Sequence, residues 1–389
     1  MGDLILTFTG RDAPGITARI SRALAQSNAR LSDVEQVVVQ GLLTLGFAVE
    51  AQDEPALLKE LLFVARELGL ALDYRKPVKP RAEAPPRYAL TLIGRTLGAS
   101  ELRTVSELLA AHGANIERIV RLSEGGLTSV EFAISLPGED APLERALLQA
   151  AGQGAFDCAL QRETLLRRSK RLIVMDMDST LIRIEVIDEL ARSHGVGEEV
   201  AAITRRAMQG EMDYDRSLRE RVALLKGLDA RVLYELAENL PLAEGAETLL
   251  RVLRRLGYRT AVISGGFSVA AEALQKRLGI DFAWSNTLEI EGGALTGRVV
   301  GPIVNARRKA EILEELAARE GVPLDQVIAI GDGANDLLML QKAGHGIAFH
   351  AKPKLREAAH SAISASGLDA ILYLLGITGR DVASLERTE

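Results

Sequence analysis

Two aspartates directly follow a short apolar run near the middle of the chain. The segment Arg171–Thr180 reads RLIVMDMDST, so Asp176 and Asp178 are two residues apart. On an extended backbone, residues two apart point to the same side. One carboxylate could therefore attack an electrophile such as phosphorus while the other moves a proton. The Thr180 hydroxyl could fix the turn that carries both.

Two more apolar runs end in polar residues in the same way. The run YRTAVIS ends at Ser264, and the run QVIAIGD ends at Asp332, followed by GANDLLML with Asp336. Continuous apolar runs are typical of strands buried on both faces of a parallel sheet. Ligands of open α/β sheets bind outside the carboxyl ends of the strands. We therefore expect these side chains to meet at one mouth, with Lys309 at the start of a helix over 309–320.

Several carboxylates in one place repel one another unless a cation lies among them. Oxygen ligands alone favour Mg²⁺. A magnesium site beside Lys309 and the Ser264 hydroxyl suits a phosphoryl group, whose charged oxygens need neutralising. Taken singly, these motifs also fit a helix cap, a turn or a solvated lysine. Their order along one chain favours phosphoryl-transfer chemistry.

The remaining elements must position these residues. In residues 168–389 helical stretches at 243–255, 267–278 and 309–320 separate the apolar runs, which indicates a doubly wound α/β domain with a parallel sheet. Residues 184–240, between the first two strands, are mostly helical and longer than one crossover needs. We expect them to form a helical cap over the edge of the sheet.

The N-terminal part contains a repeat. Residues 1–76 and 88–167 each read strand, glycine turn, helix, two strands, helix and strand, and Gly10 aligns with Gly94. This order is that of two ferredoxin-like βαββαβ units. Residues 77–87 between them are rich in proline and charge, so we expect an extended linker.

Composition narrows the class of protein. A chain of 389 residues favours two or three domains. The net charge of −6, with lysine and arginine scattered, argues against nucleic-acid binding. No apolar stretch approaches the roughly 20 residues needed to span a bilayer, so no membrane association is expected. A lone cysteine, Cys158, excludes internal disulfides and suits the cytoplasm.

The motifs also carry a resemblance to a known family. DMDSTL, VISGGF, Lys309 and GDGANDLLML resemble the four motifs of the haloacid dehalogenase superfamily, and residues 171–375 resemble phosphoserine phosphatases throughout. The resemblance implies Mg²⁺-dependent hydrolysis of O-phospho-L-serine, the last step of serine biosynthesis, through an aspartyl phosphate. It implies that Asp176 is the nucleophile and Asp178 the general acid/base. Mg²⁺ would be held by Asp176, the Asp178 carbonyl and Asp332.

The same resemblance implies a set of substrate contacts. In the cap, Glu185 would hold the ammonium of the substrate and Arg221 its carboxylate. An amino-acid zwitterion needs one anion and one cation at opposite ends, and arginine can clasp a carboxylate with two hydrogen bonds. The other implied contacts are Ser264, Gly265 and Lys309 on the phosphoryl oxygens, Asn335 and Asp336 in the phosphate and metal shell, and Met208 and Tyr214 along the pocket.

Three alternatives remain open from the sequence. One is hydrolysis of another small phosphomonoester, such as phosphothreonine or a sugar phosphate. Another is transfer to an acceptor other than water. The third is an amino-acid sensor that retains an inactive phosphatase-like domain. The pair of Glu185 and Arg221 favours an amino-acid phosphate, and the retained carboxylates favour an active enzyme.

The repeated units carry a second resemblance. GRDAPGITARIS in the first copy resembles the first turn of an ACT domain, a ferredoxin-like module that often binds amino acids. The second copy, GRTLGASELRTVS, lacks the aspartate and the proline. The resemblance implies a homodimer assembled through residues 1–165, with L-serine as a feedback effector. Its binding candidates are Asp12, Gly15 and Asn28.

Overall fold

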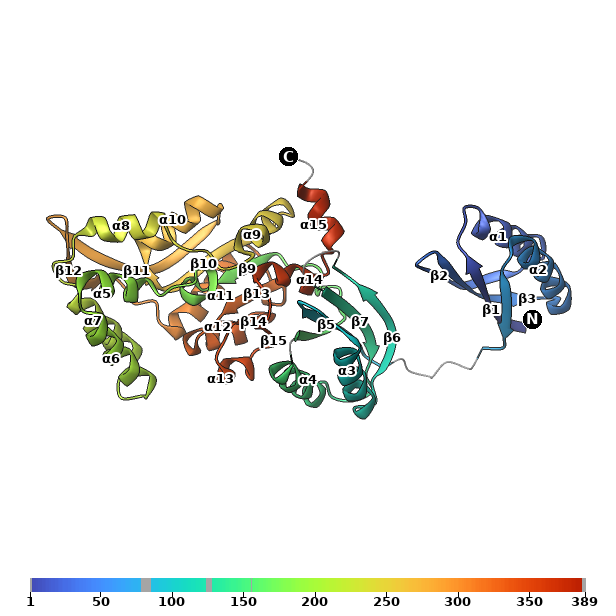
Figure 1. The fold of residues 1–389 in the computed structure, drawn as a ribbon, viewed down its shortest axis with the longest axis horizontal. Helices are drawn as coiled ribbons and strands as arrows, with labels where there is room; N and C mark the ends of the chain where they lie inside the picture. The colour runs from blue at the N-terminus through green and yellow to red at the C-terminus, as the bar shows by residue number, and fades with distance from the viewer. Residues whose placement is uncertain (1, 78–84, 124–127, 155, 387–389) are drawn as a thin grey trace. The chain divides into compact units, whose positions relative to one another are not determined.

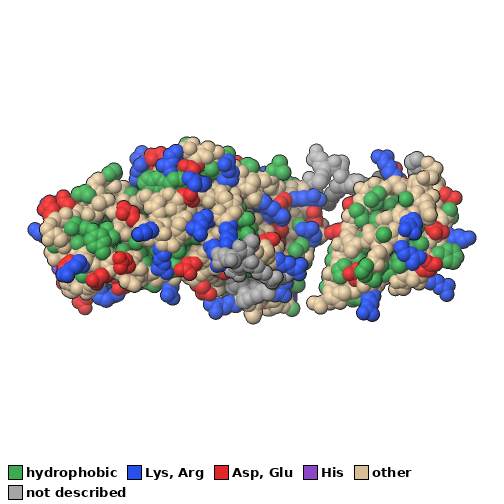
Figure 2. Space-filling model, turned by 90° about the horizontal axis from the view of Figure 1, so that it is seen from above, with side chains coloured by type: hydrophobic (Ala, Val, Ile, Leu, Met, Phe, Trp, Pro, Cys, Tyr) green, Lys and Arg blue, Asp and Glu red, His purple; other side chains and the backbone are tan. Residues whose placement is uncertain are grey.

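The computed structural model describes residues 2–77, 85–123, 128–154 and 156–386 (Figure 1). It forms two compact units, Met1–Ala84 and Pro85–Glu389, and each is described here by itself. Most of the expected linker over 77–87 lies outside the described residues. Within the described ranges no helix has the length and apolar character to cross a membrane. On the face shown in Figure 2, acidic and basic side chains are interspersed rather than gathered by sign.

The first unit is a four-stranded antiparallel sheet with two helices packed on one face. Its strand order is β2-β3-β1-β4, the arrangement of a ferredoxin-like unit, as the sequence predicts. Alternate residues of the first strand, Leu4, Leu6 and Phe8, are buried under the helices. The elements are β1 (Gly2–Arg11), α1 (Ile16–Gln26), β2 (Arg30–Val39), β3 (Leu42–Ala51), α2 (Glu54–Leu68) and β4 (Ala71–Arg75).

The second unit begins with another ferredoxin-like sheet, in the order β8-β5-β7-β6. Its elements are β5 (Arg87–Gly94), α3 (Ala99–Ala111), β6 (Asn115–Arg121), β7 (Thr128–Ser135), α4 (Ala141–Gln153) and β8 (Phe156–Arg162). Its edge strand β8 pairs antiparallel with β15 (Ser361–Ile363), so that Cys158 lies opposite Ala362. This pairing joins the ferredoxin-like sheet to the parallel sheet of the doubly wound part, and together they form one sheet of eleven strands. The sequence analysis did not anticipate this junction.

The doubly wound part of the sheet is parallel, with helices on both faces (Figure 1). On the first strand, Ile173 and Met175 face one core, and Leu172 and Val174 face the other. This alternation explains the continuous apolar run and confirms the doubly wound class. The strands are β9 (Leu172–Met175), β10 (Arg259–Phe267), β11 (Phe282–Glu291), β13 (Val327–Gly331), β14 (His345–Phe349) and β15, with β12 (Ala294–Val300) antiparallel at the edge. The flanking helices are α9 (Ala246–Arg255) and α10 (Ser268–Leu278) on one face, and α11 (Ala306–Arg319) and α12 (Leu337–Lys342) on the other.

The segment between β9 and β10 contains the expected helical cap. It consists of α5 (Val186–His194), α6 (Gly197–Met208), α7 (Tyr214–Leu224) and α8 (Ala230–Glu238). The cap also contacts the β11–β12 hairpin: the Gly227 amide donates to the Leu295 carbonyl at 2.8 Å, and Asp229 bridges to Ala294. The hairpin therefore supports the cap from the edge of the sheet.

One local expectation needs correction. The helix that carries Lys309 begins at Ala306, because the side chain of Asn305 caps it, so Lys309 lies in its first turn rather than at its start. After Gly376, α15 (Gly379–Glu386) forms, and the Gly379 amide donates to the Leu122 carbonyl. The remaining short helices are α13 (Pro353–Arg356) and α14 (Ile371–Leu374).

Candidate active site

The central strand β9 delivers Asp176 to the carboxyl edge of the sheet. The backbone amide of Asp176 donates a hydrogen bond to the Ile330 carbonyl of β13 at 2.9 Å, which fixes the backbone where β9 ends. The chain then turns through Ser179, whose φ of 57° lies in the left-handed region that side chains rarely adopt. This turn directs Asp178 toward the cap, where its carboxylate accepts a hydrogen bond from the Val186 amide at 3.1 Å. Asp178 is therefore held beside the first helix of the cap, while Asp176 stays at the end of β9.

A buried lysine lies between two of the carboxylates. Lys309 Nζ is 2.8 Å from Asp176 Oδ1 and 2.7 Å from Asp336 Oδ1, and the lysine side chain is fully buried. Burial disfavours its charge, but the two carboxylates outweigh burial and raise the pKa of Lys309. Burial, and then the charge of Asp176, raises the pKa of Asp336 to about 7, against the opposing effect of Lys309. The lysine is therefore charged and holds Asp176 in place.

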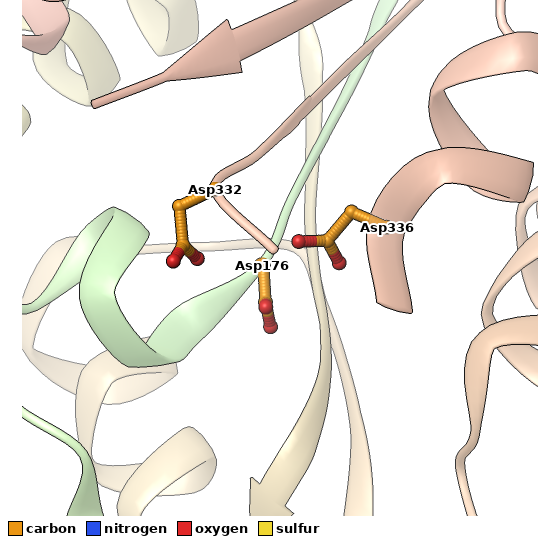
Figure 3. A group of neighbouring side chains, drawn as sticks. All are labelled: Asp176, Asp332 and Asp336. Atoms are coloured by element: carbon orange, nitrogen blue, oxygen red, sulfur yellow. The ribbon is translucent and has the colours of Figure 1, made fainter. Parts of the chain in front are cut away.

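Three carboxylates, two of which contact this lysine, lie close together (Figure 3). One oxygen each from Asp176, Asp332 and Asp336 lies within 4.8 Å of the others. Burial, followed by the charges of Asp176 and Glu185, raises the pKa of Asp332 to about 6. A divalent cation with oxygen ligands would relieve this repulsion. The donor set therefore fits Mg²⁺.

Close backbone approaches make this cluster possible. A Cβ atom on Gly331 would lie 2.4 Å from Asp336 Cγ, so only glycine fits there. The Thr180 hydroxyl donates to Asp332 Oδ1 at 3.1 Å. Thr180 thus ties two loops together, whereas the sequence analysis assigned it to its own turn.

The carboxyl-terminal end of β10, residues 264–267, presents polar groups to the same space. Ser264 Oγ accepts a hydrogen bond from the Gly266 amide at 2.8 Å. The Gly265 carbonyl accepts from the Tyr214 hydroxyl at 3.1 Å and from Asn286 Nδ2 at 2.7 Å. Tyr214 therefore links the cap to the end of β10. The sequence analysis missed Asn286, which stands in an ordinary β-strand with no motif around it.

A cavity of about 610 Å³ lies between the cap and the carboxyl edge of the sheet. This volume suits a small metabolite. Thr180, Lys309 and Asp336 lie behind its wall. The polar and methionine side chains that line the cavity but were not predicted from the sequence are Asp188, Thr204, Met212, Ser217 and Lys352. The residues from the sequence analysis that line it are Asp176, Asp178, Glu185, Met208, Tyr214, Arg221, Ser264, Gly265, Asp332 and Asn335.

The cap contributes an anion and a cation to this cavity. Glu185 accepts a hydrogen bond from the Ser179 hydroxyl at 2.8 Å, and Arg221 Nε donates to the Ser217 carbonyl at 3.4 Å. Burial raises the pKa of Glu185, while Arg221 lowers it. Burial, then Glu185 and Asp176, raises the pKa of Asp178 well above its usual value. Asp178 is therefore suited to carry a proton.

The effector candidates lie apart from this cavity, in the first unit. Asp12 and Gly15 stand in the exposed loop before α1, where the Asp12 amide donates to the Gly41 carbonyl at 2.9 Å. Asn28 follows the other end of α1 with a φ of 51°. An 11-residue helix is about 16 Å long. A molecule the size of a free amino acid therefore cannot contact both Gly15 and Asn28 of one chain.

Comparison with known proteins agrees with the fold and the site. Residues 170–344 match the haloacid dehalogenase-like hydrolase family, and residues 3–75 and 87–161 each match an ACT domain family. The chain is 44% identical to a phosphoserine phosphatase of Streptomyces coelicolor over 390 residues, covering 98% of this chain and 94% of that protein.

Two solved structures are also similar. A HAD family hydrolase from Salmonella enterica serovar Typhi is 33% identical with a TM-score of 0.66, over 74% of this chain and 98% of that one. A phosphoserine phosphatase described as a phospho-aspartyl intermediate analogue is 45% identical with a TM-score of 0.50, over 53% of this chain and 98% of that one.

The parallel sheet, the cap and the carboxylate cluster define a haloacid dehalogenase-like hydrolase that carries two ACT domains. Within that class, the similarity extends over nearly the full length of the chain and of its relatives. The chain belongs to the phosphoserine phosphatase family.

Proposed function

We propose that this enzyme hydrolyses O-phospho-L-serine to L-serine and phosphate, the last step of serine biosynthesis. The observation that supports this substrate is the placement of Glu185 and Arg221 in the cavity that also contains Asp176. A phosphorylated amino acid presents an ammonium and a carboxylate at the end away from phosphorus. The cap offers one charge for each, and a sugar phosphate has no use for that pair.

The reaction we propose passes through an aspartyl phosphate. Asp176, held by Lys309, attacks phosphorus, and the bond from phosphorus to the serine oxygen breaks. Asp178 gives its proton to that oxygen and then takes a proton from the water that attacks the aspartyl phosphate. The bond between phosphorus and the Asp176 oxygen then breaks, which releases phosphate and restores the Asp176 carboxylate. The raised pKa of Asp178 and the phospho-aspartyl analogue of a relative support this sequence.

We propose Mg²⁺ as the cofactor. Asp176, Asp332 and the Asp178 carbonyl would hold the ion, with Asp336 close enough to contribute. When bound, the ion would offset the negative charge of the phosphoryl oxygens and of the carboxylates around them. Ser264 and the Gly265 amide, at the end of β10, and Asn335, after β13, would bind the phosphoryl oxygens.

Arginine substitution tests the substrate assignment. Arg221→Ala should raise the KM for phosphoserine by about 10- to 100-fold, since a charged hydrogen-bonding group is lost. The KM for p-nitrophenyl phosphate should change far less, because that substrate has no carboxylate. Arg219→Ala, on the exposed side of the same helix, is the control. An equal effect of Arg221→Ala on both substrates would refute the assignment.

We also propose that the enzyme is a homodimer joined through its first ACT domain. Strand β2 is an edge strand, and its helix-facing residues Leu31, Val34 and Val38 remain 44–52% exposed because α1 and α2 do not cover them. An apolar edge strand of ten residues readily pairs with another chain. The partner we propose is the same strand of a second copy.

Such pairing would create the site for a serine effector. Because Gly15 and Asn28 lie at opposite ends of α1, a serine would contact Asp12 and Gly15 of one protomer and Asn28 of the other. Val34→Lys should convert the dimer to a monomer in light scattering and abolish serine binding in equilibrium dialysis. Phe63→Lys, on exposed α2, is the control. A dimer that survives Val34→Lys would contradict this arrangement.

We propose a cytoplasmic location on narrower grounds. The single cysteine, Cys158, is buried and free, which suits a reducing compartment. Fractionation of cells that express the tagged chain tests this, and recovery with secreted material would refute it.

A further inference from the structure

Lys352 is a cation at the mouth of the cavity with no role in the scheme above. It follows β14 by three residues, and β14 lies beside β13, whose carboxyl end delivers Asp332. Lys352 therefore reaches the catalytic edge of the sheet, and it lines the cavity. Its neighbours in the sequence form no recognisable motif, so the sequence alone did not predict that Lys352 belongs to the site.

Lys352 is one of few cations in a cavity whose charged lining side chains are mainly carboxylates. Five carboxylates line the cavity, but Arg221 and Lys352 are the only lysine or arginine side chains among its described lining residues. Lys309 is buried behind the wall between two carboxylates. Among the described residues, the ammonium of Lys352 forms no ion pair, and the residue is exposed. An anionic substrate that approaches this acidic mouth therefore meets Lys352 as an available cation.

The second ACT domain holds the loop that carries Lys352. Asp157 of β8 is 3% exposed. Its two carboxylate oxygens accept hydrogen bonds from the Ser364 amide at 2.7 Å and the Ala365 amide at 2.9 Å. The carbonyl of the next residue, Ser366, accepts a hydrogen bond from His350 Nε2 at 3.1 Å. His350 has a φ of 46° and stands two residues before Lys352. A left-handed histidine needs such support.

We propose that Lys352 recruits the phosphorylated substrate and contacts its phosphoryl group at the mouth of the cavity. We further infer that Asp157 is a positioning residue that acts through Lys352. This inference rests on the proposed hydrolysis of phosphoserine. It makes the second ACT domain part of the support of the active site, in addition to any regulatory role.

The first experiment compares Lys352→Gln with Lys276→Gln, which removes the same charge from exposed α10 outside the cavity. Steady-state kinetics are measured in the presence of Mg²⁺, from low salt to high salt. Lys352→Gln should lower kcat/KM for phosphoserine by about tenfold at low salt, as expected for one lost charge contact. The difference should shrink at high salt, and kcat should stay within about twofold of the parent enzyme.

The outcomes separate this inference from the proposed function. If the parent enzyme does not release phosphate from phosphoserine, the proposed function fails and this inference fails with it. If the parent enzyme is active but Lys352→Gln matches Lys276→Gln in kcat/KM and salt dependence, only the role of Lys352 is overturned. A fall in kcat with unchanged KM would also overturn recruitment, because it would place the lysine in the chemical step.

A double-mutant cycle tests the positioning role. Asp157→Asn should lower kcat/KM in the parent enzyme but have little further effect in the Lys352→Gln enzyme, since both changes act on one contact. Equal losses in both backgrounds, or no loss in either, would overturn the link. If Asp157→Asn does not fold, His350→Asn replaces it in the same cycle. Asparagine tolerates the left-handed backbone but cannot reach the residue 366 carbonyl in the same way.

Discussion

Replacement of the buried lysine tests the electrostatics of the site in depth. Lys309→Met keeps an unbranched side chain but removes the charge that contacts Asp176 and Asp336 at 2.8 and 2.7 Å. All three side chains are at least 95% buried, so the two carboxylates would lose their partner without gaining water. Removal of one partner from a buried ion pair costs about 3–5 kcal/mol. We expect a loss of that size in the free energy of unfolding at pH 8.

The pH dependence of this loss has a defined sign. Burial raises the pKa of Asp336 to about 7, and Lys309 opposes that rise. In Lys309→Met the pKa of Asp336 therefore increases further. An acid whose pKa is higher in the native state than in the unfolded state keeps its proton longer in the native state. The free energy of unfolding therefore falls as the pH rises toward the native pKa. The cost of the substitution should therefore grow by about 1 kcal/mol between pH 7 and pH 8.

The assay uses the single tryptophan of the chain. Trp284 lies in β11, and the centroid of its ring is 5.9 Å from that of Phe282. Its fluorescence in urea therefore follows unfolding of the phosphatase part. Adding Asp336→Asn to Lys309→Met should recover part of the loss, because one unpaired charge is then gone. Lys276→Met is the surface control. A single variant as stable as the parent, or one whose loss does not depend on pH, would refute the reasoning.

Three further predictions concern the same site. Gly331→Ala should cost about 1–3 kcal/mol by the same fluorescence assay, because its Cβ would lie 2.4 Å from Asp336 Cγ; a neutral result would contradict the tight approach. Tyr214→Phe should cost about 0.5–1.5 kcal/mol, since the Gly265 carbonyl loses one of two donors, and unchanged stability would show that this bond is unimportant. The rise in melting temperature caused by Mg²⁺ should increase from pH 5 to pH 8, because protons leave Asp332, whose pKa is raised to about 6, and cease to compete with the ion. A rise that is the same at both pH values would argue against Asp332 as a ligand.

The fold class was predictable because its signals are local. The apolar run Leu172–Met175 is continuous because its residues face two different cores, and the glycine turns at Gly10 and Gly94 repeat. The pairing of β8 with β15 was not predictable. The β15 strand has three residues, and its partner lies some two hundred positions earlier, so no local pattern records the contact.

In the candidate site too, residues that follow apolar runs were predictable, and residues placed by tertiary contacts were not. Asp176 and Asp332 stand at the ends of apolar runs, so the topology of a parallel sheet was enough to bring them together. Asn286 and Lys352 gain their positions from tertiary contacts alone, and nothing in their neighbouring residues marks them. The contact of Thr180 with Asp332 also depends on two loops that only the folded sheet brings together.

Trapping of the intermediate tests the central claim most directly. The enzyme is mixed with phosphoserine and Mg²⁺, quenched in acid within the first turnover and reduced with borohydride, which converts an acyl phosphate to an alcohol. Peptide mass spectrometry then locates the reduced side chain. The account predicts reduction at Asp176, with a larger yield in Asp178→Asn enzyme if loss of the base slows dephosphorylation more than phosphorylation. Reduction at another carboxylate, or none while phosphate is being released, would contradict it.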